Sequence, residues 1–502
     1  MSATLFTFGP RRFAAAASAA LVAVAVAACG SGGSAPTNGA TTGLALSKCT
    51  VQSVAARCGS LSVPENPALP NGRHIHVRVV VVPAYGTHTA SDPLFYFAGG
   101  PGGAASDSVQ WAAKTFHVFN ELHDLVFIDQ RGTGGSNAMN CPALMNIAEG
   151  GYGTVPSAAA EASAARACLA LTARSGDPTM YTTPLFTDDV DQVRAALGYA
   201  SIDIYGGSYG VSSGLTYIQR HGEHVRAALF DSGSLLDVRL WQLSAASQQS
   251  ALQTVLNRCA AEAACHATFP HVAAMLSDIL ARLTAAPVAV DVTNPRSGAV
   301  VHVTVNPVDF ISVLSELLDA VQDQAQVPTF IFTANLGNWA HIVQQLMAIA
   351  PTSNPTDTLV AAQTIKCSDA WAQMDPAAIR ATGGASLFTD FMVERAMAQQ
   401  AFCAAWPAAA GAFGPVHSTA PIVFLNGTAD PADPPGNVAG AAATMPNSVS
   451  VAVENYGHGV FSQDSSGCLA NEATDFLAKG VPSKPADWLC AMNPPLPLFN
   501  VG

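Results

Sequence analysis

The stretch IDIYGGSYGVSSG, residues 202–214, places a serine on a Gly-rich turn between an apolar run and a helical pattern. Gly206 and Gly210 stand two residues before and after Ser208. A serine on a tight strand-to-helix turn has a strained backbone, and side chains at those two positions would collide. The stretch therefore predicts a strand at 201–207, a helix at 209–222 and an exposed nucleophile, Ser208. A Gly-rich loop without a catalytic role is the alternative.

Strand and helix patterns alternate on both sides of this turn. Further strands are predicted at 74–84, 93–100, 124–132, 224–233, 421–430 and 448–459, and helices at 188–199 and 468–480. We expect the helix at 188–199 to carry two acids in its first turn and Gly198 near its end. This alternation predicts an α/β fold, the α/β-hydrolase fold, with a mostly parallel sheet flanked by helices.

One long helical and Ala-rich stretch interrupts the α/β pattern. We expect a signal segment at 1–28, a flexible tether at 29–48 and the first part of the core at 49–235. A mainly helical cap inserted between core strands then follows at 236–405, with one hairpin near 287–305. The second part of the core is expected at 406–502. With a net charge of −13 and no basic cluster, the chain is not expected to bind nucleic acid.

The N-terminus has the pattern of an export signal. Two arginines precede an apolar run of 16 residues, 13–28, which is shorter than the ~20 residues of a membrane-spanning helix. The run ends in VAACG, which resembles a bacterial lipoprotein signal, with Cys29 as the lipidated first residue of the mature chain. We therefore expect an exported protein anchored by lipid to the outer face of the cell membrane. An ordinary secretory signal that contains a cysteine is the alternative.

Ten further cysteines support export, because an even number in an exported chain suggests disulfides. Pairing neighbours in order gives five local bridges, although the sequence does not fix the connectivity. No CxxC pattern occurs, so neither a metal site nor a cofactor is expected. The ten are Cys49, Cys58, Cys141, Cys168, Cys259, Cys265, Cys367, Cys403, Cys468 and Cys490.

A nucleophilic serine needs a base and an acid, which in α/β-hydrolases follow it in the order acid, then histidine. Asp430 comes directly after an apolar strand, and His458 is the one histidine beyond it. We therefore expect Ser208 to attack a carbonyl, His458 to transfer the proton and Asp430 to orient the imidazole. Asp433 is the alternative acid.

The oxyanion of such a reaction needs two backbone donors. One is expected to be the amide of Tyr209, directly after the nucleophile. The other is expected in the loop FAGGPGG, residues 97–103, with Gly100 as the donor.

Five motifs together resemble one family. GGPG at 99–102, DQRGTGGS at 129–136, GGSYG at 206–210, NGTADP at 426–431 and GHG at 457–459 occur in the order of the prolyl/tripeptidyl aminopeptidase family of α/β-hydrolases. The chain looks most like the secreted tripeptidyl-aminopeptidase-like branch from actinobacteria, including mycobacterial-type lipoproteins. The resemblance runs from about residue 49 to the end and is weakest in the cap. Ala98 departs from it, because many relatives carry histidine there.

The resemblance implies a serine peptidase that releases di- or tripeptides from substrates with free N-termini. Such an enzyme must hold the substrate's α-ammonium, and an acid in the cap would do so. Asp369, in KCSDAW at 366–371, is the first candidate and Glu65, in VPENP, the second. Asp369 could equally be an ordinary loop acid beside a disulfide. The alternatives for the whole chain are a carboxylesterase or lipase on the same fold, and an inactive binding lipoprotein.

Overall fold

The computed structural model describes residues 44–87, 89–144, 155–294, 298–349, 359–369, 374–409, 411, 413–482 and 484–501. The signal segment, Cys29 and most of the tether lie outside the described residues. Within them, no helix combines the length and the apolarity needed to cross a membrane.

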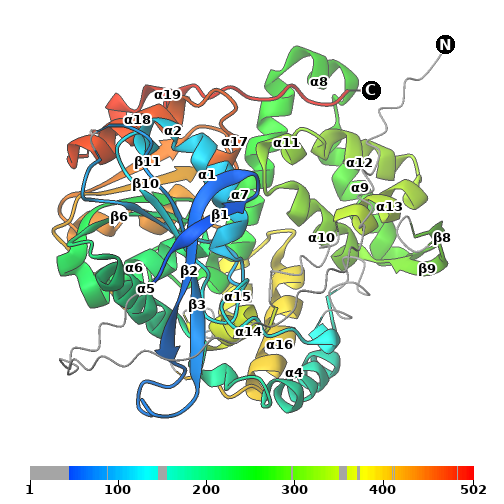
Figure 1. Ribbon diagram of the computed structural model, residues 1–502. Helices are drawn as coiled ribbons and strands as arrows, with labels where there is room; N and C mark the ends of the chain where they lie inside the picture. The colour runs from blue at the N-terminus through cyan, green and yellow to red at the C-terminus, as the bar shows by residue number, and fades with distance from the viewer. Residues whose placement is uncertain are drawn as a thin grey trace, which may run out of the picture. The chain divides into compact units, whose positions relative to one another are not determined.

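A nine-stranded sheet forms the core of the chain (Figure 1). Its strand order is β1-β2-β3-β5-β4-β6-β7-β10-β11. The six strands from β5 to β11 in this order run parallel, and β1, β2 and β3 pair antiparallel. The predicted α/β-hydrolase class with a mostly parallel sheet is confirmed. The strands are β1 Ser47–Val51, β2 Val54–Pro64, β3 His74–Val82, β4 Leu94–Phe97, β5 Leu125–Ile128, β6 Ile202–Gly207, β7 Val225–Asp231, β10 Ile422–Gly427 and β11 Ser448–Val453.

Helices cover both faces of the sheet, because its central strands are apolar on both sides. Alternate residues of β5 show this: Phe127 packs toward α1, α2 and α18, whereas Val126 packs toward α5 and α6. These helices are α1 Val109–Thr115, α2 His117–Asn120, α5 Thr183–Leu197, α6 Tyr209–His221 and α18 Cys468–Lys479. The short helices α17 Val460–Gln463 and α19 Leu489–Met492 complete the C-terminal part.

Two sequence expectations differ from the structure. The hairpin of β1 and β2 was not expected, because its exposed and buried residues alternate without a strong apolar run. Helix α5 begins at Thr183, with a proline in its first turn, so Asp188 and Asp189 lie beyond the first turn. Its end is where the sequence placed it, since Gly198 caps the helix with a φ of 82°, in the left-handed region that glycine favours.

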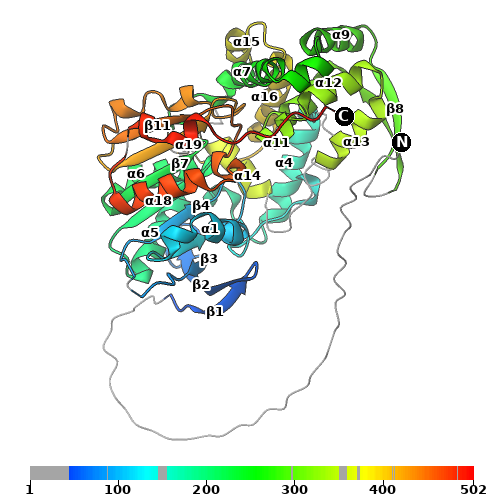
Figure 2. The ribbon, with the colours of Figure 1, turned by 90° about the horizontal axis from the view of Figure 1, so that it is seen from above.

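The segment between β7 and β10 forms most of a second hydrophobic core, which Phe499 near the C-terminus joins. We call residues 236–405 the cap. Figure 2 shows α7, α15 and α16 side by side, and the hairpin of β8 and β9 packs beside α13. The elements are α7 Leu240–Ala261, α8 Ala263–Thr268, α9 Val272–Ala285, β8 Val288–Thr293, β9 Val300–Val305, α10 Pro307–Leu317, α11 Val321–Gln324, α12 Val327–Asn335, α13 Trp339–Ile349, α14 Leu359–Ser368, α15 Pro376–Gly383 and α16 Thr389–Ala404.

One helix from outside this segment packs with the cap. Helix α4, Ala158–Thr172, lies between β5 and β6 in sequence and contacts α16. Ala165 and Cys168 of α4 share a small buried cluster with Val360 of α14 and Phe402 of α16. The cap therefore packs against α4, a helix inserted between two core strands, and the sequence patterns did not predict this contact.

Candidate active site

Ser208 occupies the tight turn between β6 and α6. Its φ of 56° and ψ of −123° are strained values for a residue with a side chain. A Cβ on Gly206 would lie 2.5 Å from the carbonyl oxygen of Gly210, and a Cβ on Gly210 would lie 2.1 Å from that of Phe97. The two glycines therefore permit the turn and its close approach to β4.

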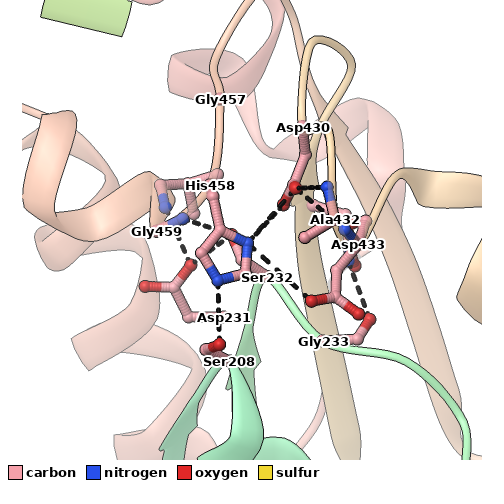
Figure 3. A network of polar contacts seen from close by, with 12 residues as sticks. Ser208, Asp231, Ser232, Gly233, Asp430, Ala432, Asp433, Gly457, His458 and Gly459 are labelled. Atoms are coloured by element: carbon pink, nitrogen blue, oxygen red, sulfur yellow. Dashed lines mark hydrogen bonds and ion pairs between the residues drawn. The ribbon is translucent and has the colours of Figure 1, made fainter. Parts of the chain in front are cut away.

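His458 lies in the loop after β11, with its imidazole directed at Ser208 (Figure 3). Its Nε2 is 2.8 Å from the Oγ of Ser208. The Nδ1 lies 3.0 Å from Oδ2 and 3.2 Å from Oδ1 of Asp430. Because a carboxylate only accepts, Nδ1 carries the proton and Nε2 is left to accept from the serine hydroxyl.

Asp430 follows β10 and is held by its own turn. Its Oδ1 accepts the backbone amides of Ala432 and Asp433, each at 2.8 Å. The carboxylate of Asp433 lies farther from His458 Nδ1, at 3.8 Å, and accepts instead from the hydroxyl of Ser234 at 2.5 Å. Of the two acids considered from the sequence, Asp430 is therefore the one placed to orient the imidazole.

Asp231 and Ser232, at the end of β7, support the histidine loop. Asp231 accepts the amide of Val460 at 2.8 Å, and the hydroxyl of Ser232 accepts the amide of Gly459 at 2.8 Å. The phenol of Tyr205 donates to the same aspartate at 2.9 Å. The sequence indicated a strand end here and gave no sign of this role, because the partners lie 227 or more residues downstream.

Three carboxylates surround the imidazole. Burial alone would lower the pKa of His458, but Asp430, Asp433 and Asp319 together raise it well above its usual value. Burial raises the pKa of Asp433 to about 7, with the charge of His458 acting in the opposite direction. The three carboxylates therefore stabilise the charged form of the His458 imidazole, and burial opposes them.

The loop at 97–103 packs directly against Ser208. A Cβ on Gly99 would lie 3.0 Å from the carbonyl oxygen of Gly207 and 3.3 Å from the Cβ of Ser208. Gly100 lines the same cavity as Ser208, and Tyr209 is the first residue of α6. Of the two residues expected to supply oxyanion donors, Gly100 thus lines the cavity with Ser208, and Tyr209 directly follows Ser208.

A cavity of about 600 Å³ opens above Ser208. This volume is typical of sites for small ligands. The core contributes Gly100, Ser208, Asp433 and His458, and the cap contributes apolar residues together with Glu316, Asp319 and Arg395. The ionisable lining is thus three carboxylates, the imidazole of His458 and one guanidinium.

Glu316 and Asp319 stand where α10 ends and both keep solvent-accessible surface in the cavity. Surrounding protein atoms nevertheless desolvate Asp319 and raise its pKa to about 6, while the charge of His458 acts in the opposite direction. Sequence reasoning missed both acids, because the end of an ordinary amphipathic helix carries no local sign of a binding site.

The two acids that the sequence suggested as ammonium anchors lie elsewhere. Glu65 is buried and accepts from the phenol of Tyr181 at 2.8 Å and from the amide of Asp177 at 3.0 Å. Asp369 is buried and accepts from the hydroxyl of Thr183 at 2.6 Å. Neither residue lines the cavity at Ser208.

The loop DQRGTGGS is tied down by its charged residues. Asp129 accepts the amides of Ser106 and Gly135 at 2.8 and 2.9 Å. Arg131 makes two hydrogen bonds of 2.7 Å to the buried Asp189 of α5. Asp129 and Arg131 thus connect this loop to the segment at Ser106 and to helix α5, which is a structural role.

All ten cysteines considered from the sequence form disulfides, and each pairs with its neighbour in order. The bridges are Cys49–Cys58, Cys141–Cys168, Cys259–Cys265, Cys367–Cys403 and Cys468–Cys490.

Three groups among the described residues bring possible metal ligands together, and none lines the cavity at Ser208. The first, Asp191 with His221 and His224, already holds Arg194, and the second, Asp92 with His123 and Asp203, already holds Arg226. The third contains the disulfide of Cys468 and Cys490.

Known proteins share parts of this chain. Residues 389–489 match the family model described as TAP-like protein. Tripeptidyl aminopeptidases of Streptomyces coelicolor and Streptomyces lividans are each 32% identical over 193 residues, which is 35% of this chain and 35% of theirs. The chain thus spans about a third of the length of the curated relatives it matches.

Two solved structures align with most of the chain at low similarity. A proline iminopeptidase from Mycobacterium smegmatis aligns at 14% identity with a TM-score of 0.37, covering 84% of this chain and 98% of its own. A thermophilic esterase from Thermogutta terrifontis aligns at 12% identity with a TM-score of 0.37, covering 84% and 99%. The resemblance indicated by the five motifs is confirmed by the family model and the Streptomyces relatives. The chain therefore has the α/β-hydrolase fold, and its residues 389–489 are similar to the TAP-like family.

Proposed function

We propose that the protein is an exported serine peptidase that releases di- or tripeptides from free N-termini. The observation that carries the proposal is the hydrogen-bonded line from Ser208 through His458 to Asp430, which opens into a cavity with an acidic wall. The relatives named tripeptidyl aminopeptidase support the peptidase class.

The chemistry follows from the contacts. Oγ of Ser208 attacks the substrate carbonyl while His458 Nε2 accepts its proton, and Asp430 stabilises the imidazolium. The amides of Gly100 and Tyr209 stabilise the oxyanion. His458 then returns the proton to the leaving amine, an acyl-enzyme remains on Ser208, and water releases the short peptide by the same steps.

Glu316 and Asp319 take the role for which the sequence offered Asp369 and Glu65. Both residues line the same cavity as Ser208, so we expect the N-terminal ammonium of a substrate to reach them. A charged hydrogen bond of this kind contributes about 1.5–3 kcal/mol, which corresponds to roughly ten- to a hundredfold in affinity.

The experiment compares three substrate sets on the same enzyme: free peptide amides, their N-acetylated forms and p-nitrophenyl esters. We expect fluorophosphonate to label the wild type and not Ser208→Ala, and free peptides to be cleaved in preference to acetylated ones. Glu316→Gln and Asp319→Asn should raise KM for free peptides only. Glu394→Gln, an exposed acid of the cap outside the cavity, is the matched control.

Two results would remove the proposal. Equal labelling of the wild type and Ser208→Ala would remove the nucleophile. Equal cleavage of free and acetylated peptides would remove the aminopeptidase class.

An esterase is the second candidate. Leu240, Trp241 and Met392 give the cavity an apolar stretch that an acyl chain could contact. Turnover confined to esters would therefore identify an esterase.

Export and lipid attachment at Cys29 belong to the same proposal. The five disulfides support an oxidising compartment. Expressed in an actinobacterial host, the wild type should fractionate with membranes and Cys29→Ser should be released into the medium. Membrane retention of the variant would instead favour an anchor other than lipid on this cysteine.

A further inference from the structure

Asp369 ends a buried line of side-chain hydrogen bonds. It follows α14 of the cap, and only 8% of it is exposed. Its Oδ2 accepts from the hydroxyl of Thr183, the first residue of α5, at 2.6 Å. The hydroxyl of Ser368 lies 3.2 Å from Oδ1. The carboxylate is therefore engaged with the protein interior and not with the cavity.

The line continues to the residue that follows the nucleophile. Oγ1 of Thr183 lies 2.6 Å from the phenol oxygen of Tyr209, which also accepts from Nε2 of Gln130 at 3.1 Å. Ionised Asp369 only accepts, so the single hydroxyl proton of Thr183 points to it. Tyr209 must then donate to Thr183, and Gln130 donates to Tyr209. The charge of Asp369 thus fixes the direction of the two hydroxyl bonds, from Tyr209 to Thr183 and from Thr183 to Asp369.

Tyr209 joins this line to the proposed chemistry. Its backbone amide is a proposed oxyanion donor, and its peptide bond leads directly to Ser208. Ser208 has a φ of 56°, a value that persists only where the surrounding structure holds the turn in place. The Tyr209 side chain is 4% exposed and its phenol is bonded on both sides, so its ring cannot shift without breaking the line.

We propose that Asp369 is a positioning residue which, through the hydroxyl of Thr183 and the phenol of Tyr209, holds the Tyr209 amide and the Ser208 side chain in reactive geometry. The inference rests on the proposed function, because it presupposes that Ser208 is the nucleophile. It gives Asp369 a role different from the ammonium anchor suggested by the sequence. Through Asp369, which directly follows α14, the cap would also help to hold the turn at Ser208.

This direction of donation belongs to the ionised form of Asp369, which prevails at a pH above the pKa of its carboxyl group. Burial raises the pKa of Asp369 to about 7, while the hydrogen bonds from Thr183 and Ser368 favour the charged form. Burial, together with the charge of Asp369, raises the pKa of Tyr209, so its phenol keeps the proton that it donates.

The test removes the middle of the line without changing its shape. Thr183→Val keeps the volume and loses the hydroxyl, and Asp369→Asn replaces an acceptor with a group that also donates. Thr183→Ser restores the hydroxyl. The matched control is Thr187→Val, because Thr187 is a fully buried threonine of the same helix and its hydroxyl donates to the Pro184 carbonyl within that helix. Activity is measured on a free peptide amide and on p-nitrophenyl acetate, with the fluorophosphonate labelling rate and Tm alongside.

We expect Thr183→Val and Asp369→Asn to lower kcat by roughly 10- to 100-fold on both substrates, below the 10² to 10³ lost with a whole oxyanion donor. KM should stay within about twofold. Thr183→Ser should recover most of kcat, Thr187→Val should match the wild type, and the double variant Thr183→Val/Asp369→Asn should be no slower than Thr183→Val alone.

Two outcomes overturn the inference. A wild-type kcat in folded Thr183→Val would show that the line does not position the nucleophile. A rise in KM for the free peptide alone in Asp369→Asn would make Asp369 an ammonium anchor. If Asp369→Asn fails to fold, Thr183→Val and Thr183→Ser still test whether the line of hydrogen bonds positions Ser208. Failure of the proposed function can be told apart from failure of the positioning role. In that case the wild type itself would not react with fluorophosphonate and would hydrolyse neither substrate.

Discussion

The backbone amide of His458 donates a 2.6 Å hydrogen bond to the carbonyl oxygen of Asp319, in the cap between α10 and α11. Both residues also line the cavity above Ser208. The proposed base and the acidic wall of the substrate site are therefore joined through the backbone. A change in the position of one changes the position of the other.

Gly457→Ala tests this join directly. A Cβ at Gly457 would lie 2.1 Å from the Asp319 carbonyl oxygen, so the loop and the cap would have to separate. We expect a loss of about 1–3 kcal/mol in the free energy of unfolding, as for other overpacked sites, and a larger relative fall in kcat. Gly436→Ala is the control, because a Cβ there meets nothing within 4 Å. Equal behaviour of the two variants in Tm and kcat would contradict the interpretation.

The two adjacent glycines before Ser208 should differ sharply in tolerance. Gly206→Ala places a Cβ 2.5 Å from the Gly210 carbonyl oxygen, whereas at Gly207 the nearest atom is the phenol oxygen of Tyr205 at 3.4 Å, an ordinary contact. We expect Gly206→Ala to lose fluorophosphonate labelling by at least 100-fold and Gly207→Ala to stay within about tenfold of the wild type. Labelling time courses on purified proteins measure the difference, and similar rates would place the strain of the turn elsewhere.

The pH profile should report the charges around His458. In the proposed mechanism the neutral imidazole is the base, and the pKa of His458 is raised well above 6.5 by Asp430, Asp433 and Asp319, against the effect of burial. Activity should therefore rise with pH through an apparent pKa above 6.5. Asp433→Asn removes one negative charge, lowers the pKa of His458 and moves the rising limb of kcat/KM to lower pH. Asp278→Asn, an exposed acid of α9, should leave the profile in place.

A shift of the Asp433→Asn profile toward higher pH would contradict this assignment of charge. So would a rising limb at or below pH 6.5 in the wild type.

The five disulfides should contribute unequally to stability. Cys367–Cys403 joins α14 to α16 across 36 residues, whereas Cys49–Cys58 closes nine, and all four cysteines are half-buried. Loop entropy alone gives about 3.8 and 2.6 kcal/mol for the two. Replacing both cysteines by alanine should therefore lower the free energy of unfolding by about 1 kcal/mol more for the first pair. Denaturant unfolding of the two variants measures the difference, and the reverse order would show that native contacts outweigh chain entropy.

The sequence predicted those features that depend on local chemistry. Strands appear as apolar runs because the sheet is buried on both faces. Ser208 was found because its turn demands glycine at fixed positions, and His458 because the order of the chain left one candidate after Asp430. The structure brings these three side chains into a single hydrogen-bonded line.

The remaining features depend on partners far away in the chain. Asp369 meets Thr183 across 186 residues, and the pattern around KCSDAW does not tell a buried carboxylate from one facing a ligand. Glu316 and Asp319 resemble other acids at a helix end until the cap is folded over Ser208. Helix α4 likewise shows no sign in its Ala-rich sequence that it packs against α16.

Segment 315–324 of the cap has a consequence for protein engineering. It supplies part of the wall of the cavity above Ser208, its Asp319 carbonyl accepts from the His458 amide, and its Gln324 side chain donates to the Ala429 carbonyl, next to Asp430, at 3.1 Å. The cap is thus not an exchangeable module. A chimera that grafts another cap onto this core must rebuild these hydrogen bonds, since a transplant that alters specificity will otherwise also disturb the alignment of acid and base.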